Sequence, residues 1–180
     1  MKYILNTSPE EKTPASVVEL NSFRFNDGSA FPASYIEFAQ QFGYGITCGE
    51  FMIYVPMGDY CDSFSNQSKA IKSTYSDVLK NPEDVWFPLE PDADFETLSR
   101  LIPFGKSENG YYLFWDSKRS TPNEMDIYIT DFRGLGFVKA AGNLYELIAK
   151  MTNSEHFKEV FPRFRQEELP ATFKPLQKRT

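Results

Sequence analysis

The sequence contains few side chains whose type and spacing could support catalysis. His156 is the single histidine, and it lies in a predicted amphipathic helix beside charged residues, with no serine or cysteine motif near it. A surface histidine is therefore favoured over a general base. Asp116 and Asp126 could form the carboxylate pair of a glycosidase if the fold brought them together, but a chain with 25 acidic residues forms such pairs by chance. We therefore expect that the protein is not an enzyme.

Sites for metals, phosphates and redox chemistry are equally weak candidates. The acids Asp92, Asp94 and Glu96 lack the glycine and the closing glutamate of a calcium-binding loop, so a solvated acidic loop is favoured. Gly43-Tyr44-Gly45 lacks the lysine and hydroxyl arrangement of a phosphate loop and instead predicts the end of a helix. Cys48 and Cys61 form no CxxC pair and are expected to be reduced and structural. No metal and no cofactor is expected.

The net charge and its distribution along the chain distinguish between possible binding partners. The formal net charge is −6, and phosphate binding requires a basic footprint, so a direct nucleic-acid ligand is not expected. The negative charge is concentrated in the middle of the chain, where residues 50–131 hold 15 acidic and 7 basic side chains. This acidic central third favours a basic partner surface.

Length and composition predict one domain with a large aromatic core. The chain has 180 residues, of which 41% are hydrophobic and 16% aromatic, which suits one well-buried domain. The sequence has no apolar run of about 18 residues that could span a membrane. Residues 1–6 also lack the apolar region of a signal peptide. We therefore expect a cytoplasmic protein that makes no membrane contact.

The strongest structural pattern is a β-hairpin over residues 101–116. Asn109-Gly110 provides the turn, because both residues tolerate positive φ at low cost. In the outgoing strand Leu113 and Trp115 share one face while Tyr112 and Phe114 share the other, since side chains alternate along a strand. Both faces are apolar, which predicts a central strand that is covered on both sides.

Other patterns supply the elements around this hairpin. Thr13 is predicted to cap a short helix that continues to Leu20, and Asn143 to cap a helix over 144–151. Helices are also predicted over 31–43, with Pro32 in the first turn, and over 62–79. Further strands are predicted over 50–56 and 125–130, with a short edge strand at 137–139. The fold class is therefore α+β, a single domain with a largely antiparallel sheet flanked by helices.

The end of the chain differs in composition from the rest. Residues 163–180 hold five basic and two acidic side chains with little apolar content. We expect the domain to span 1–162, and the basic C-terminal tail 163–180 to be loose or packed as an extended arm.

Three segments resemble the SMI1/KNR4 family, also called the SUKH superfamily. Residues 31–38, FPASYIEF, resemble its LP-x-x-Y-x-x-F helix, with Phe31 where leucine is usual. Residues 102–105 and 109–116 are similar to its pattern of a strand, a glycine-containing turn and a strand that ends in aspartate. The strand at 126–130 followed by the helix at 144–151 matches its closing elements. The resemblance covers about residues 13–152.

The resemblance implies a single α+β domain without catalytic residues common to the family. It also implies a function in binding other proteins. Bacterial members are mostly regarded as immunity proteins that bind and neutralise toxins, many of which are nucleases. Fungal members act in cell-wall regulation. We expect an immunity protein whose acidic surface meets a basic toxin domain, for example a nuclease. The alternative is an intracellular adaptor or regulatory module without a toxin partner. Family members bind through different surfaces, so the expected partner-binding residues come from the acidic region of this chain: Glu90, Asp92, Asp94, Glu96, Glu108 and Tyr112.

Overall fold

One sheet runs through the molecule and organises its other elements. The computed structural model describes residues 3–163 and 165–179. Within these residues eight strands follow the order β1-β8-β2-β3-β4-β5-β6-β7, and neighbours are antiparallel except for β1 and β8. The strands are β1 Asn6–Thr7, β2 Gly45–Thr47, β3 Phe51–Ile53, β4 Leu101–Ser107, β5 Tyr112–Asp116, β6 Ile127–Thr130, β7 Val138–Ala141 and β8 Thr172–Pro175. The predicted α+β class with a largely antiparallel sheet is confirmed.

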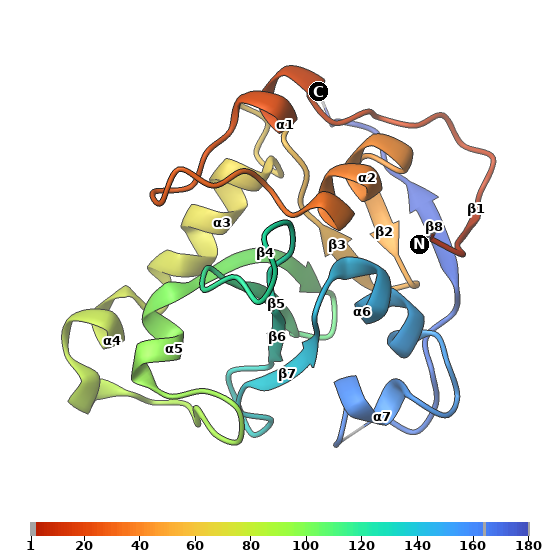
Figure 1. Ribbon diagram of the computed structural model, residues 1–180. Helices are drawn as coiled ribbons and strands as arrows, with labels where there is room; N and C mark the ends of the chain where they lie inside the picture. The colour runs from red at the N-terminus through yellow and green to blue at the C-terminus, as the bar shows by residue number, and fades with distance from the viewer. Residues whose placement is uncertain (1–2, 164, 180) are drawn as a thin grey trace.

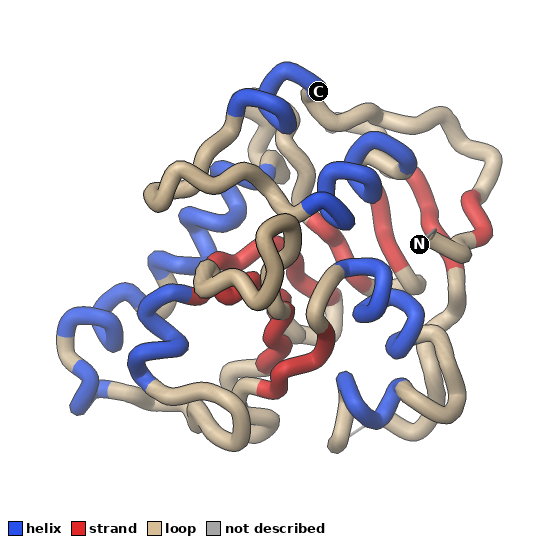
Figure 2. The backbone as a smooth tube through the Cα atoms, viewed as in Figure 1, coloured by secondary structure: helices blue, strands red, loops and turns tan. Residues whose placement is uncertain are grey.

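The helices gather in two groups around this sheet (Figures 1 and 2). The helix α2 contacts α6, which continues towards α7, while α3 lies on β4 and α4 contacts α5 at the other end. Their bounds are α1 Val17–Ser22, α2 Ala33–Gln41, α3 Phe64–Ser73, α4 Ser76–Lys80, α5 Phe95–Arg100, α6 Leu144–Met151 and α7 Phe157–Val160, with a 3-10 turn η1 at Pro82–Asp84. None of the helices described is long and apolar enough to cross a membrane.

The predicted hairpin forms the centre of the sheet. Strands β4 and β5 pair from Leu101 with Asp116 to Lys106 with Tyr112, and Gly110 adopts φ +88° in the turn. The register shifts at Phe104, which forms a bulge in β4. Its ring stacks on the Trp115 indole, with centroids 4.1 Å apart and planes 5° apart. The bulge thus aims an aromatic ring at the central tryptophan.

Both faces of β5 are buried, as the alternation predicted. On one face the Trp115 ring contacts the rings of Phe31, Tyr35 and Phe64. On the other face Phe114 contacts Tyr75, Phe132 and Phe137. The aromatic excess of the sequence is therefore used mainly in two layers of core, one on each side of the strand.

The expected boundaries of two helices were wrong. Thr13 is not a cap: it bridges to Tyr44 and its hydroxyl donates to the Leu176 carbonyl at 2.7 Å, while Ser16 caps α1. The helix expected over 62–79 is interrupted at Tyr75, where φ −124° and ψ 16° separate α3 from α4. This break allows the Tyr75 ring to be buried against Phe114 and Phe132.

The tail after residue 162 contributes a strand to the sheet. Strand β8 lies between β1 and β2, and Phe173, which is 1% exposed, contacts the rings of Phe38 and Phe42. A side chain at Gly45 would meet the Lys174 carbonyl at 2.4 Å, so glycine permits this close pairing. The division at 162 stays a prediction, but the segment that follows includes an extended arm that completes the sheet.

Replacing Trp115 by alanine is expected to lower the free energy of unfolding by roughly 3–5 kcal/mol, because it removes a buried indole and leaves a cavity. Denaturant unfolding of the purified variant measures this loss. Trp86→Ala is the matched control, since Trp86 is 61% exposed and Trp115 is 1% exposed. A loss below about 1 kcal/mol for Trp115→Ala would contradict its place in the core.

Candidate protein-binding surface

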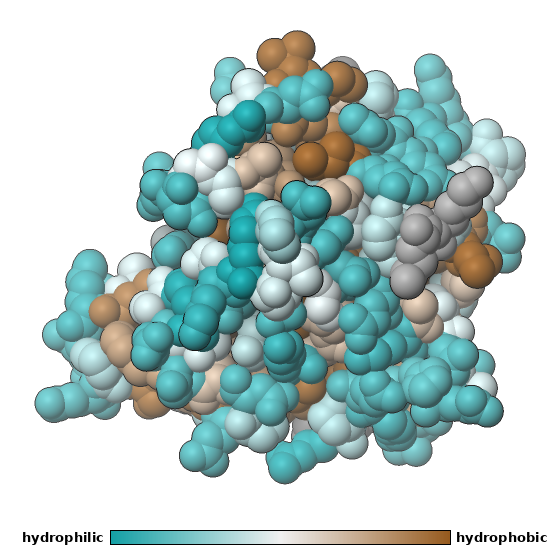
Figure 3. Space-filling view, in the orientation of Figure 1, coloured by the Kyte–Doolittle hydropathy of each residue, from teal (hydrophilic) through white to brown (hydrophobic). Residues whose placement is uncertain are grey.

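The loop between α4 and α5 presents an exposed tryptophan. Trp86 is 61% exposed, and it is the one aromatic residue among the strongly exposed large hydrophobic side chains of the described chain. In Figure 3 apolar colour gathers at the lower left, over α4 and the loop after it, and at the top over α1, on a mostly hydrophilic face. The patch on α1 comes from the aliphatic side chains of Val17 and Val18. Tryptophan is one of the residue types enriched at binding hot spots.

The Trp86 indole packs against two buried aromatic rings. The indole lies edge-to-face on Phe87 with centroids 4.8 Å apart and lies 5.9 Å from the Phe132 ring. Phe87 is 3% exposed and Phe132 is 9% exposed, so both rings belong to the core. Trp86 therefore projects from a rigid base, which reduces the conformational entropy that a partner must restrict.

The turn after β6 fixes Phe132 in this position. Phe132 adopts φ +52°, and its N–H donates to the Thr130 hydroxyl at 3.1 Å. One Asp131 carboxylate oxygen accepts the N–H groups of Arg133, Gly134 and Leu135 at 2.8–3.1 Å. This network replaces the backbone bonds that the turn lacks.

Tyr112 joins the same cluster from β5. Its ring lies 5.1 Å from Phe132, and the Lys106 ammonium lies 5.5 Å from the ring centroid. Tyr112 is half-buried. The structure thus connects this predicted site residue to the loop through Phe132.

Three exposed acids flank Trp86: Glu83, Asp84 and Glu90. Within the described residues their carboxylates make no hydrogen bond or ion pair, so their charge is directed to solvent. The loop that carries Glu90 is fixed to the start of β7, because Phe137 donates to the Leu89 carbonyl at 3.2 Å and accepts from Asp92 N–H at 3.1 Å. We call Trp86, Tyr112 and these three acids the Trp86 face.

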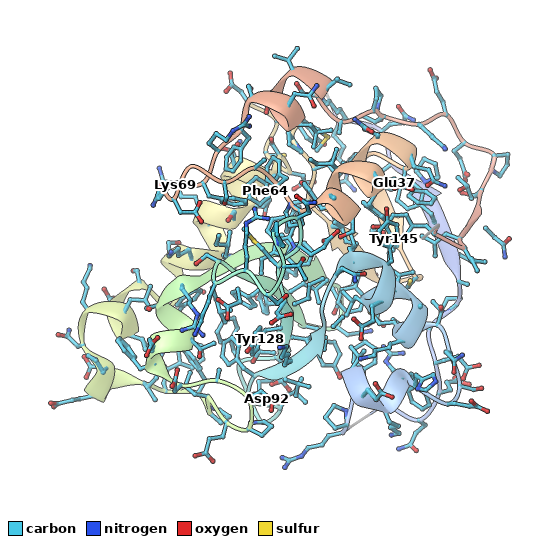
Figure 4. The ribbon with its side chains drawn as sticks, in the orientation of Figure 1. Glu37, Phe64, Lys69, Asp92, Tyr128 and Tyr145 are labelled. Atoms are coloured by element: carbon cyan, nitrogen blue, oxygen red, sulfur yellow. The ribbon has the colours of Figure 1, made fainter. Side chains whose placement is uncertain are left out.

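The neighbouring acids have structural roles. The Asp92 carboxylate accepts the Lys139 N–H at 2.8 Å, and Figure 4 places Asp92 on the loop below β7. Asp94 caps α5 by accepting from the Thr97 N–H at 2.7 Å and the Thr97 hydroxyl at 2.8 Å. Glu96 pairs with Arg100 at 3.3 Å. These predicted site residues lie close together, but their carboxylates also hold local structure.

Glu108 lies apart from this group. It is exposed in the turn after β4, where its N–H donates to the Glu50 carbonyl at 3.1 Å. Glu96 precedes β4 and Glu108 follows it, so a strand of seven residues separates them, roughly 20 Å along the sheet. The structure does not bring Glu108 together with Glu96.

The residues that sequence reasoning missed are Trp86, Glu83 and Asp84. The sequence does contain a pattern that indicates this surface, because Trp86 follows two acidic residues in a segment bounded by Pro82 and Pro88. Prolines mark such a segment as loop, where a large aromatic ring has less chance of burial.

The side chains that were considered for catalysis, Asp116, Asp126 and His156, each contact a residue of opposite or complementary charge. The Asp116 N–H donates to the Asp126 carbonyl at 2.9 Å, so these two acids are neighbours. The Asp116 carboxylate binds Arg100 at 2.7 Å and Asp126 binds Lys139 at 2.7 Å. These hydrogen bonds raise the pKa of both cations, Arg100 and Lys139. His156 Nδ1 lies 2.8 Å from Glu159, and residues 3–163 and 165–179 hold no group of three or more side chains placed to bind a metal.

Comparison with known proteins identifies one matching family model, described as SUKH_6, SMI1-KNR4 cell-wall. It matches residues 26–148, which include the Trp86 face and the central hairpin. Neither a search of curated proteins nor a search of solved structures gives a match.

Replacing Asp94 by alanine is expected to lower the thermal midpoint at pH 7, because α5 loses its cap. The hydrogen bonds from Thr97 lower the pKa of Asp94 below the ordinary 3.8. The stabilisation is therefore fully present above the unfolded-state pKa and is lost as the pH falls through the folded-state pKa. Thermal unfolding of both proteins between pH 7 and about pH 2 should show the difference shrinking in acid.

Asp94→Asn is the control, since asparagine also caps helices but carries no charge. The thermal midpoint of Asp94→Asn at pH 7 should lie close to that of the wild type. Equal midpoints for wild type and Asp94→Ala at pH 7, or a difference that persists unchanged in acid, would contradict the capping role.

Proposed function

Because the chain belongs to the SMI1-KNR4 (SUKH) family, we propose that it is an immunity protein that neutralises a toxin by binding it through the Trp86 face. Members of this family are associated with immunity proteins of toxin systems. The proposal concerns binding alone and assigns no chemical step to this chain. Both cysteines, Cys48 and Cys61, are free thiols, which supports a cytoplasmic site of action.

The observation that carries the proposal is the exposed indole of Trp86 on its rigid aromatic base. A side chain of this size gains much from desolvation in a partner pocket and loses little entropy there, because the rings below it already restrict it. Tyr112 extends the apolar area next to it through Phe132. An anchor with an apolar centre and a charged rim has the anatomy of a protein interface.

The charge around this anchor favours a basic partner. Glu83, Asp84 and Glu90 are exposed and lie within four positions of Trp86. Acids without internal partners attract a cationic surface and speed the encounter, and salt screens that attraction. A nuclease needs a cationic cleft to hold phosphates, so we propose a nuclease domain as the toxin, with the Trp86 face excluding nucleic acid from its cleft.

We predict that Glu83→Lys with Glu90→Lys slows association with the toxin domain about tenfold at low salt and weakens the salt dependence of the rate. These acids suit the test better than Asp92, Asp94 and Glu96, whose carboxylates hold structure. The measurement is stopped-flow association with a neighbouring gene product that the wild-type chain binds. The matched control is Glu11→Lys with Glu155→Lys, which makes the same change of charge at exposed acids outside the Trp86 face.

Trp86→Ala should act on dissociation and cost about 2 kcal/mol of binding, close to thirtyfold in affinity. Val18→Ala is its control, since Val18 is 77% exposed on α1. Protection of growing cells from the toxin should follow the measured affinity. Wild-type affinity for both the Trp86 and the Glu83/Glu90 variants would overturn the assigned surface, and failure to bind any neighbouring gene product would favour a regulatory adaptor.

A further inference from the structure

A second surface has the opposite charge. A cleft of about 840 Å³ opens between the loop 23–27, α3 and the junction of α5 with β4. Figure 4 labels Phe64 and Lys69 on α3, where that helix faces the loop. The volume lies within the range of about 300–1,000 Å³ typical of ligand pockets. No residue of the Trp86 face lines it.

The floor of the cleft is apolar and partly exposed. Phe23 and Phe25 are half-buried and pack edge-to-face with centroids 5.0 Å apart. Phe23 also lies 5.5 Å from Phe64, whose ring continues into the core at Trp115. Ile102 is half-buried beside them. The floor can therefore receive an apolar side chain without rearrangement of the sheet.

The rim is cationic, although the chain as a whole is acidic. Arg24, Lys69, Lys72 and Arg100 line the cleft, and Asp27 is the one acid among the lining residues. Arg100 already binds Asp116 and Glu96, and Asp27 accepts from Ser29. Lys69 and Lys72 are exposed and form no ion pair within the part of the chain that the structure describes. Their charge is therefore available to a ligand.

We propose that this cleft binds an acidic segment of another protein, in which carboxylates flank an apolar side chain. Lys69 and Lys72 stand three residues apart on α3, about 4.5 Å along its axis, so they can meet successive carboxylates. Ser65 and Ser68 on the same helix line the cleft and offer hydroxyls to the peptide backbone. The apolar side chain of the segment covers Phe23 and Phe25.

The spread of charge favours a peptide over a small phosphate compound. A phosphate site brings several donors to one point, often with a guanidinium fork. Here Arg24 donates instead to the carbonyls of Asn21 and Phe23 in its own loop, at 2.8 and 2.6 Å. The inference is independent of the toxin proposal, because the cleft selects a partner of opposite charge at a different place on the molecule.

The test is an NMR titration of the full chain with a blocked octapeptide of aspartate and leucine. Backbone amide shifts should concentrate at residues 23–27 and along α3. Lys69→Glu with Lys72→Glu should weaken the affinity by about tenfold or more. Lys80→Glu with Lys174→Glu changes the charge equally at exposed positions outside the cleft lining, and it should shift the affinity by less than about twofold.

Three comparison ligands complete the experiment. The same peptide with lysine in place of aspartate should produce no shifts in the cleft, and inorganic phosphate and ATP should bind more weakly than the acidic peptide. If phosphate or ATP binds saturably and the acidic peptide causes no shifts, the proposal is overturned in favour of a small-anion site. Shifts confined to the Trp86 face, equal loss in both lysine variants, or a dimer abolished by Lys69→Glu with Lys72→Glu would also overturn it. Thermal midpoints confirm that each variant is folded.

Discussion

The burial of strand β5 on both faces is the constraint on which the rest of the structure depends. A strand carrying Leu113, Phe114 and Trp115 in succession cannot leave either side in water, so two covering layers are required. The segment that leads from α1 through α2 to α3 supplies rings against Trp115. The segment from Tyr75 to the turn after β6 supplies rings against Phe114. The two candidate surfaces lie on the outer sides of these two layers. Phe64 connects the cleft lined by Lys69 and Lys72 to Trp115. Phe132 connects Trp86 to Phe114.

Charge is distributed according to this division. Asp116 with Arg100 and Asp126 with Lys139 form ion pairs near the ends of the central strands, where they stabilise the fold locally and contribute little net field. In the part of the chain that the structure describes, three acids that form no ion pair, Glu83, Asp84 and Glu90, flank Trp86, and two lysines that form no ion pair, Lys69 and Lys72, lie on α3. A formal net charge of −6 therefore hides two regions of opposite sign. A net charge describes solubility and average steering, whereas recognition depends on the local pattern.

The sequence predicted the elements that depend on local patterns. The hairpin at 101–116, the helix capped by Asn143 and the α+β class all follow from alternation, turn chemistry and capping, and the structure confirms them. Strands β2 and β8 were not predicted, because Gly45–Thr47 and Thr172–Pro175 are short, contain a glycine or a proline, and pair with each other across a long separation in sequence. Thr13 failed as a cap for the same reason, since its hydroxyl bonds to Leu176. Of the candidate site, acidity and Tyr112 were visible in the sequence, but the packing of Trp86 against Phe132 joins residues that are far apart in the sequence.

The insertion of β8 between β1 and β2 has a consequence for the order in which the sheet can be assembled. During synthesis the strands β3 to β7 leave the ribosome well before Thr172–Pro175. Until β8 arrives, β2 has an open edge and the rings of Phe38 and Phe42 lack Phe173. An exposed edge of this kind is a template for pairing with other chains. The nascent protein thus depends on a strand that is synthesised after β7 to close an edge that would otherwise favour aggregation.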